Sequence, residues 1–265
     1  MTGSLDLAPV ITFVRALKRN NSREWLEAHR PDYHAARQHF EDYVAAIIEA
    51  LSRTAPMGAL SPKDCIFRLN RDLRFSRDKS PYKPYMGAYI APGGRKSRRL
   101  GYYIHIEAAD HSIIGGGLYE PEPSQLAAWR ASIDRDSRKF RRITAAAAFR
   151  KYFGQVRGDR LKTAPRGYPK DHPDLDLLQL KRVAIWREMS DKQVLSRLFL
   201  RETLDTLKAM KPFLGYLQSL AQWSFVRLTT RWSRPGQPGV TKYAILALAG
   251  RAAHLEAVRP HQVRR

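Results

Sequence analysis

Cysteine is almost absent from this chain, and its scarcity limits the available chemistry. The 265 residues include one cysteine, Cys65. A single thiol cannot form an internal disulfide bond and cannot supply a cysteine zinc site. Cys65 stands at the start of an apolar stretch, which favours a position in the core over a role as a nucleophile.

Long apolar runs and a leader sequence are missing as well. No run of about eighteen consecutive apolar residues occurs, so no transmembrane helix is expected. The first residues, MTGSLDLAPVITFV, lack a basic segment followed by an apolar core and a cleavage site. We therefore expect a cytoplasmic protein without a membrane partner.

Familiar catalytic and metal-binding motifs do not occur either. The sequence has no HExxH, no glycine-flanked serine elbow and no Walker loop. The histidines are scattered, and the spacing of His34 and His39 does not place two metal ligands on one face of a helix. No residue is therefore assigned to a metal, and neither a cofactor nor an oligomeric state follows from the sequence.

Acidic residues are few relative to basic ones. The chain has 47 Lys and Arg against 25 Asp and Glu, which gives a net charge of +22. This excess favours anionic partners such as nucleic acid, a phosphorylated small molecule or an acidic surface. A genome that uses arginine freely would produce part of the same excess.

Apolar residues that recur every three or four positions predict several amphipathic helices. The clearest begins near Pro31 and ends near Leu51. Pro212 is expected to bend or split the last helix. The other predicted helices span residues 9–18, 124–133, 138–152 and 198–217. The expected N-caps are Ser22, Ser124, Asp171 and Ser190.

Alternation of apolar and polar residues predicts strands joined by short turns, as in an antiparallel meander. We therefore predict an α+β fold, with a largely antiparallel sheet and helices packed mainly on its apolar face. The predicted strands span residues 65–71, 84–91, 102–107 and 112–118, with a short strand at 183–186.

The composition of the chain changes near Trp223. Ser233–Gly239 (SRPGQPG) is typical of a linker, and residues 223–265 hold eight Lys or Arg and one acid. We predict a single α+β domain over residues 1–222. Residues 223–265 are predicted to be a basic, partly ordered extension that the fold does not need.

The stretch that follows Cys65, CIFRLNRDLRFSRDKSPYK, concentrates basic residues behind an apolar start. Arginine presents a rigid fork of donors that suits phosphate or carboxylate, and an anion would relieve the repulsion between clustered cations. For any single residue, a solvated loop with internal Arg–Asp pairs is the alternative. The expected ligand-binding residues are Arg68, Asn70, Arg71, Arg74, Lys79, Tyr82, Lys83 and Tyr103.

Alternation also predicts which of these side chains share a surface. In the first strand Phe67, Leu69 and Arg71 face one way, whereas Arg68, Asn70 and Asp72 face the other. Arg71 reaches the site only if the strand ends or bulges there. In residues 102–107 the polar face carries Tyr103, His105 and Glu107. We expect the polar faces to line one pocket; an ordinary wet sheet face is the alternative.

The chain resembles the bacterial family called domain of unknown function 2461 over about residues 10–220. The likeness is carried by FRLNRDLRFSRDKSPYK, GYYIHIE, GGGLYEPEP and APRGYPKDHPDLDLLQLKR, at residues 67–83, 101–107, 115–123 and 164–182. The resemblance implies no established activity, so the chemistry has to be argued from the residues.

Two functions fit the sequence, beside non-specific binding of nucleic acid driven by the overall charge, for which the chain has no recognisable DNA- or RNA-binding motif. The first is a binding domain for an anionic, phosphate-bearing ligand held by residues 66–83. The alternative is a hydrolase or transferase for a phosphorylated substrate or nucleic acid, with Asp72, His105 and Glu107 as catalytic or metal-binding groups. Arginines near Asp72 would lower its pKa and favour an ion-pair role. The enzyme hypothesis requires His105 or Glu107 within reach of Asp72.

Overall fold

The structure, a computed structural model, describes residues 5–71 and 79–230, with side chains up to residue 220. At its centre lies a four-stranded sheet in which neighbouring strands are antiparallel, in the order β1-β2-β3-β4. The strands are β1 (Met86–Ile90), β2 (Tyr102–Ile106), β3 (Ser112–Leu118) and β4 (Val183–Met189). The predicted α+β fold with a largely antiparallel sheet is confirmed.

Alternation along each strand decides which side chains enter the core. Met86 and Ala88 of β1 are buried, as are Ile104 and Ile106 of β2. Met86 pairs with Ile106 and Ala88 with Ile104, so these side chains form one apolar surface. Buried residues of β3 and β4 continue this surface: Ile114, Leu118, Val183, Ile185 and Met189.

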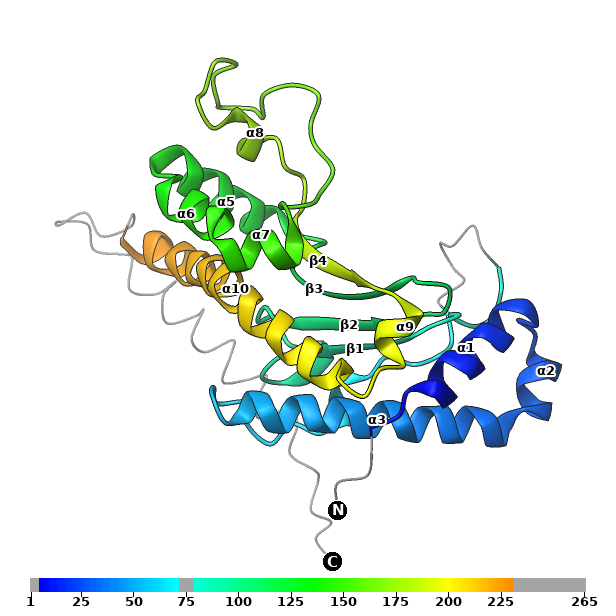
Figure 1. The fold of residues 1–265 in the computed structure, drawn as a ribbon. Helices are drawn as coiled ribbons and strands as arrows, with labels where there is room; N and C mark the ends of the chain where they lie inside the picture. Colours follow the sequence, from blue (N-terminus) through cyan, green and yellow to red (C-terminus); the bar gives the residue numbers. More distant parts are fainter. Residues whose placement is uncertain (1–4, 72–78, 231–265) are drawn as a thin grey trace, which may run out of the picture.

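Helices cover this apolar surface (Figure 1). The long helices α3 (Arg30–Ser52) and α10 (Phe199–Thr230) pack against β1 and β3 respectively. A buried hydrogen bond of 2.5 Å between the hydroxyls of Tyr43 and Thr203 joins these two helices. The shorter helices around them are α1 (Ala8–Arg19), α2 (Arg23–Ala28) and α9 (Asp191–Val194).

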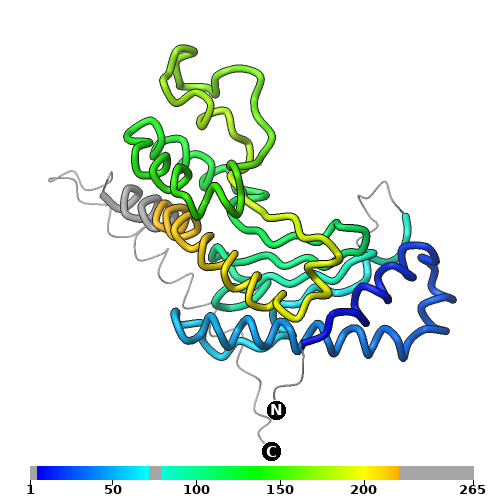
Figure 2. Tube along the Cα trace, in the orientation of Figure 1, coloured from blue at the N-terminus to red at the C-terminus, as the bar shows by residue number. Residues whose placement is uncertain are grey.

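A second group of helices packs at the far end of the sheet, away from the N-terminal helices (Figure 2). Trp129, Phe140 and Phe149 from this group form an apolar cluster with Phe213 of α10. Trp129 meets Phe140 at a centroid distance of 4.6 Å. The helices are α5 (Pro123–Arg135), α6 (Arg138–Ala145), α7 (Ala147–Phe153) and α8 (Leu175–Leu178).

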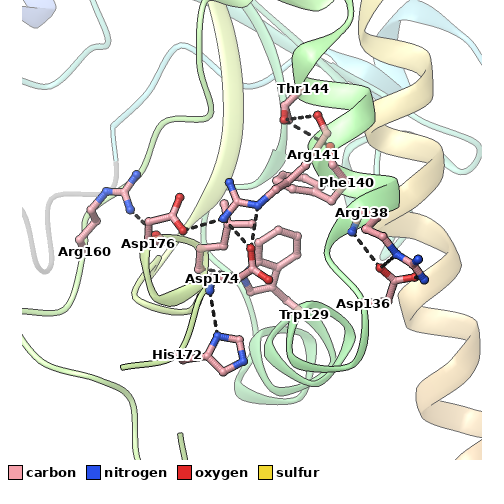
Figure 3. A network of polar contacts seen from close by, with 11 residues as sticks. Trp129, Asp136, Arg138, Phe140, Arg141, Thr144, Arg160, His172, Asp174 and Asp176 are labelled. Atoms are coloured by element: carbon pink, nitrogen blue, oxygen red, sulfur yellow. Dashed lines mark hydrogen bonds and ion pairs between the residues drawn. The ribbon is translucent and has the colours of Figure 1, made fainter. Parts of the chain in front are cut away.

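The long segment between α7 and β4 is held to α6 by charged side chains (Figure 3). Arg141 donates from Nε to Asp174 Oδ1 at 2.7 Å and from Nη2 to Asp176 Oδ1 at 2.9 Å. The backbone amide of Asp174 donates to His172 Nδ1 at 3.0 Å, and Arg160 donates to the carbonyl oxygen of Asp176. Each charge in this network has a partner, so we interpret it as a structural clamp.

The prediction of a regular strand over residues 65–71 is wrong. A capping box from Ser61 begins a helical turn, α4 (Pro62–Cys65), which takes the start of that stretch. The remainder meets the sheet edge through two isolated bridges, Ile66 with Ala88 and Asn70 with Tyr82. From one bridge to the other the chain advances four residues in the segment 66–70 but six residues in the segment 82–88. The second segment therefore carries two extra residues, which form a bulge.

Several helix predictions also need correction. Ala146 has an extended ψ of 140°, and it divides the predicted helix 138–152 into α6 and α7. Alanine is a strong helix former, so this break is imposed by packing, which places Phe149 and Phe153 in the core. Pro212 lies inside α10 without splitting it. The caps of α5 and α8 are Glu122 and Asp174, in place of the predicted Ser124 and Asp171.

Two of the predicted N-caps are confirmed. Ser22 caps α2 by accepting from the backbone amide of Trp25 at 3.2 Å, and Ser190 caps α9.

None of the described helices is both long and apolar enough to cross a bilayer. α10 runs past the predicted domain boundary at residue 222 as far as Thr230. The predicted linker at 233–239 lies outside the described residues.

Candidate functional site

The second face of the sheet, here called the open face, points away from the core and the helices packed on it. Strand pairing places alternate residues of all four strands on it, so this surface is opposite to the apolar one. Glu107, one residue beyond β2, continues the series. The open face comprises Gly87, Tyr89, Tyr103, His105, Glu107, Ile113, Gly115, Trp186 and Glu188.

A chain of hydrogen bonds runs along β2 on the open face. The Tyr103 hydroxyl lies 3.0 Å from His105 Nδ1, and His105 Nε2 lies 3.0 Å from Glu107 Oε2. Lys18 of α1 extends the chain by donating to Glu107 Oε1 at 2.9 Å. The side chains of His105 and Glu107 are only 12% and 16% exposed, so their polar groups depend on these partners.

The carboxylate of Glu107 fixes the direction of this chain. Burial alone would raise the pKa of Glu107, but hydrogen bonds from His105 and Lys18 outweigh burial and lower the pKa to about 2. Because an ionised carboxylate can only accept, His105 donates from Nε2 to Glu107 Oε2. Burial is the main cause that raises the pKa of Tyr103, which keeps the phenol protonated.

Aromatic rings surround the imidazole. Tyr85 stacks on His105 with ring centroids 4.0 Å apart and 28° between the planes. Phe67 meets Tyr103 edge-on at a centroid distance of 6.3 Å. Both of these rings border Gly87, where a Cβ would lie 3.5 Å from Phe67 Cδ2 and 3.6 Å from the Tyr103 hydroxyl.

The position of Phe67 corrects the predicted faces of residues 65–71. The Phe67 amide donates to the Gly87 carbonyl oxygen at 2.9 Å, which brings the phenylalanine ring beside the open face. Phe67 thus takes the side of the segment that was predicted for Arg68, and the Arg68 side chain is exposed to solvent. The faces predicted by alternation are wrong here because residues 66–70 pair with a bulged segment and do not keep the geometry of a regular strand.

Three cations gather beside these rings, and we call Arg68, Arg71 and Lys83 the cationic edge. Lys83 Nζ lies 5.7 Å from the Phe67 ring centroid and donates to the Arg68 carbonyl oxygen at 3.0 Å. Arg71 Nη2 donates to the Tyr82 carbonyl oxygen at 3.3 Å. Burial, and then the charges of Arg68 and Arg71, lower the pKa of Lys83. Lys83 is therefore close enough to each of the two arginines for their positive charges to repel.

The structure brings together part of the predicted set. Tyr103, His105 and Glu107 share the open face, and Arg68, Arg71 and Lys83 lie beside it. Asn70 and Lys79 are exposed. Tyr82 is 6% exposed and belongs to the core, with its backbone bonded to Asn21, so its ring does not reach the open face. Asp72 and Arg74 lie outside the described residues.

Residues that the sequence reasoning missed complete the site. Tyr85 stands two residues after Lys83, so alternation could have predicted that the two side chains lie on the same side of the chain. Trp186 lies in a strand that was predicted too short to show its pattern. Lys18 gave no local signal, because its partner Glu107 is far away in the sequence.

A shallow hollow opens next to the cationic edge. Tyr33 and Arg37 of α3 form one wall, and the other is formed by Ile66, Phe67, Leu69, Tyr85 and Met86. None of the predicted site residues lines this hollow. Within the described parts of the chain, no group of three His, Cys, Asp or Glu side chains is arranged to hold a metal ion.

These features define an α+β domain that is helical on one side of its sheet and polar and aromatic on the other. The chain belongs to the family described as conserved hypothetical protein (DUF2461), which matches residues 9–216. The resemblance found in the sequence motifs is thereby confirmed. No curated protein and no solved structure matches the chain.

Proposed function

We propose that the protein is a binding domain for an anionic, phosphate-bearing ligand, held at the cationic edge beside the open face. The observation that carries this proposal is the convergence of Lys83 with Arg68 and Arg71. Lys83 and Arg68 have no carboxylate partner among the described residues. An anion placed between these charges would relieve their repulsion.

The chemistry of the three cations suits a phosphate group. Arg68 can offer paired N–H donors, whereas Lys83 supplies a compact point charge. The Lys83 ammonium is partly desolvated against the Phe67 ring, which strengthens its interaction with an anion. The net charge of +22 would also attract an anion over a longer range.

Thermal unfolding in phosphate and in chloride at equal ionic strength tests this proposal. At ten times its dissociation constant, phosphate should add about 1.4 kcal/mol of stability, or about 3–6 °C in melting temperature. Lys83→Met removes the charge but keeps an apolar stem over Phe67, and it should abolish the phosphate effect. Arg68→Ala should act in the same way.

Lys208→Met is the matched control. Lys208 is exposed on α10, on the helical side of the sheet, so this variant loses the same charge at a distance from the cationic edge. It should keep the full phosphate effect. Equal phosphate effects in the wild type, Lys83→Met and Arg68→Ala would contradict the proposed site.

A second candidate function, a hydrolase or transferase for a phosphorylated substrate, is favoured by the chain from Tyr103 to Glu107. His105, oriented by the Glu107 carboxylate, could transfer a proton through the Tyr103 hydroxyl. Asp72, the third group of this hypothesis, lies outside the described residues. Release of nitrophenol from nitrophenyl phosphate by the wild type, and its loss in His105→Gln, would support this activity; no release by the wild type would count against it.

A further inference from the structure

We infer that the ligand is a single-stranded nucleic acid whose bases stack on the rings of the open face. This inference rests on the proposed function, because the cationic edge would hold the phosphates of the strand. Single strands are commonly bound by this combination of a basic border and aromatic side chains on which successive bases stack.

A row of rings crosses the open face. Tyr89 pairs with Tyr103, Tyr103 with Gly115, and Gly115 with Trp186, so the row passes through all four strands. Neighbouring strands lie about 4.8 Å apart, which puts the backbones of Tyr103 and Trp186 about 10 Å apart. The position between them, Gly115, carries no side chain.

Gly115 allows β3 and β4 to pack closely in the middle of the row. It is buried, and a Cβ at this position would lie 2.8 Å from both the Ile185 carbonyl oxygen and the Trp186 Cβ, so a larger residue would displace its neighbours. The ring surface of the row is therefore supplied by Tyr89, Tyr103 and Trp186.

A second group of rings lies between this row and the cationic edge. Tyr85 covers His105, and Phe67 contacts Tyr103, so the ring surface continues to Lys83 above Phe67. A strand whose phosphate is bound by Lys83 would therefore have aromatic surface next to it for its bases. This continuity connects the proposed phosphate site to the row of rings.

Cations alternate with the rings at the far border as well. The Arg157 guanidinium lies 4.7 Å from the Trp186 ring centroid, and the Arg182 guanidinium lies 4.7 Å from that of Tyr119. The Tyr119 ring is 56% exposed. Both guanidinium groups also have a carboxylate partner, Glu188 for Arg157 and Asp159 for Arg182, so what these pairs add for a nucleotide is aromatic surface.

The acids of the open face do not oppose an anionic ligand strongly. Glu107 is ion-paired with Lys18 and bonded to His105, and Glu188 is ion-paired with Arg157 at 2.8 Å. Both carboxylates therefore have a positive or donor partner already. A duplex fits this surface less well than a single strand, because its bases are stacked inside the helix and do not expose their faces.

Fluorescence anisotropy with a labelled oligothymidylate of about twelve nucleotides tests the inference. An abasic oligonucleotide of the same length carries the same phosphates without bases, and it should bind the wild type about 5- to 150-fold more weakly. A duplex of the same length should also bind more weakly than the single strand.

Ring variants locate the stacking surface. Trp186→Ala and Tyr85→Ala should each weaken binding of oligothymidylate by about 5-fold or more, whereas Trp186→Phe and Tyr85→Phe should stay within about 3-fold of the wild type. The alanine variants should keep the phosphate-induced rise in melting temperature, because they leave Lys83 in place. Lys208→Met again serves as the charge control.

The outcomes separate this inference from the proposed function. Equal affinity for the abasic and the normal oligonucleotide, or tighter binding of the duplex, would overturn stacking even if phosphate binds. A phosphate effect that persists in Lys83→Met would overturn the phosphate site, whether or not bases stack. Because the abasic comparison uses the wild type, it stands even if an alanine variant fails to fold.

Discussion

Replacing Glu107 by glutamine is expected to remove stability that depends on the charge of this carboxylate. The folded-state pKa of Glu107 is about 2, against an ordinary value of 4.5. Because the folded pKa is the lower one, the charge stabilises the fold above pH 4.5, and this contribution is lost as the pH falls towards 2. Glutamine keeps the shape of the protonated acid and should lack the contribution at every pH.

The size of the effect follows from the shift in pKa. A shift from 4.5 to about 2 corresponds to about 3 kcal/mol at pH 7, which falls to about 1.5 kcal/mol at pH 3. The Glu107 side chain is 16% exposed, but its partner Lys18 is 48% exposed, so solvent screens part of the ion pair. We therefore expect Glu107→Gln to lose about 2–3 kcal/mol at pH 7.

Urea denaturation of the wild type and Glu107→Gln between pH 3 and pH 7, followed by tryptophan fluorescence, measures this difference. Glu188→Gln is the matched control: it makes the same change on the same face, but Glu188 is 63% exposed, and it should cost less than about 1 kcal/mol. If the Glu107→Gln difference is below about 1 kcal/mol at pH 7, or does not shrink towards pH 3, the reasoning about the charge is refuted.

Three further substitutions test the packing. Tyr43→Phe should lose about 1–2 kcal/mol in urea denaturation, because the buried Thr203 hydroxyl loses its 2.5 Å partner; no loss would show that water replaces it. Gly115→Ala should lower the melting temperature by several degrees, because its Cβ would lie 2.8 Å from a backbone oxygen. Gly87→Ala is the control, since its Cβ would meet ordinary contacts of 3.5 Å or more, and it should change the melting temperature little. Equal changes in the two variants would contradict the packing argument. Ser22→Ala should cost about 1 kcal/mol, because its hydroxyl caps α2; an unchanged urea midpoint would show that the cap contributes nothing.

The pattern of apolar residues predicted the main elements because it is a local property of the chain. The period of α3, and the alternation of β2 and β3, is set by geometry within a few residues, so the helix and strands fall close to their predicted places. The same alternation predicted that Tyr103, His105 and Glu107 share a face, which the structure confirms.

Predictions failed where distant segments decide the local structure. The bulge opposite residues 66–70 depends on how that segment bridges to residues 82–88, and alternation alone cannot reveal two extra residues. The break at Ala146 likewise contradicts local propensity, since alanine favours the helix. There the burial of phenylalanines under α10 outweighs the intrinsic preference of the chain.

The sequence by itself determined the α+β class, the excess of positive charge, the family and the row of polar residues on β2, since each depends on composition or on short-range order. Only the tertiary structure decided what that row meets. It brought Lys18 to Glu107, stacked Tyr85 on His105 and placed Phe67 against Tyr103. These contacts join segments that are separate in the chain, and their partners are chosen by the packing of helices and bulged strands, which no local pattern encodes.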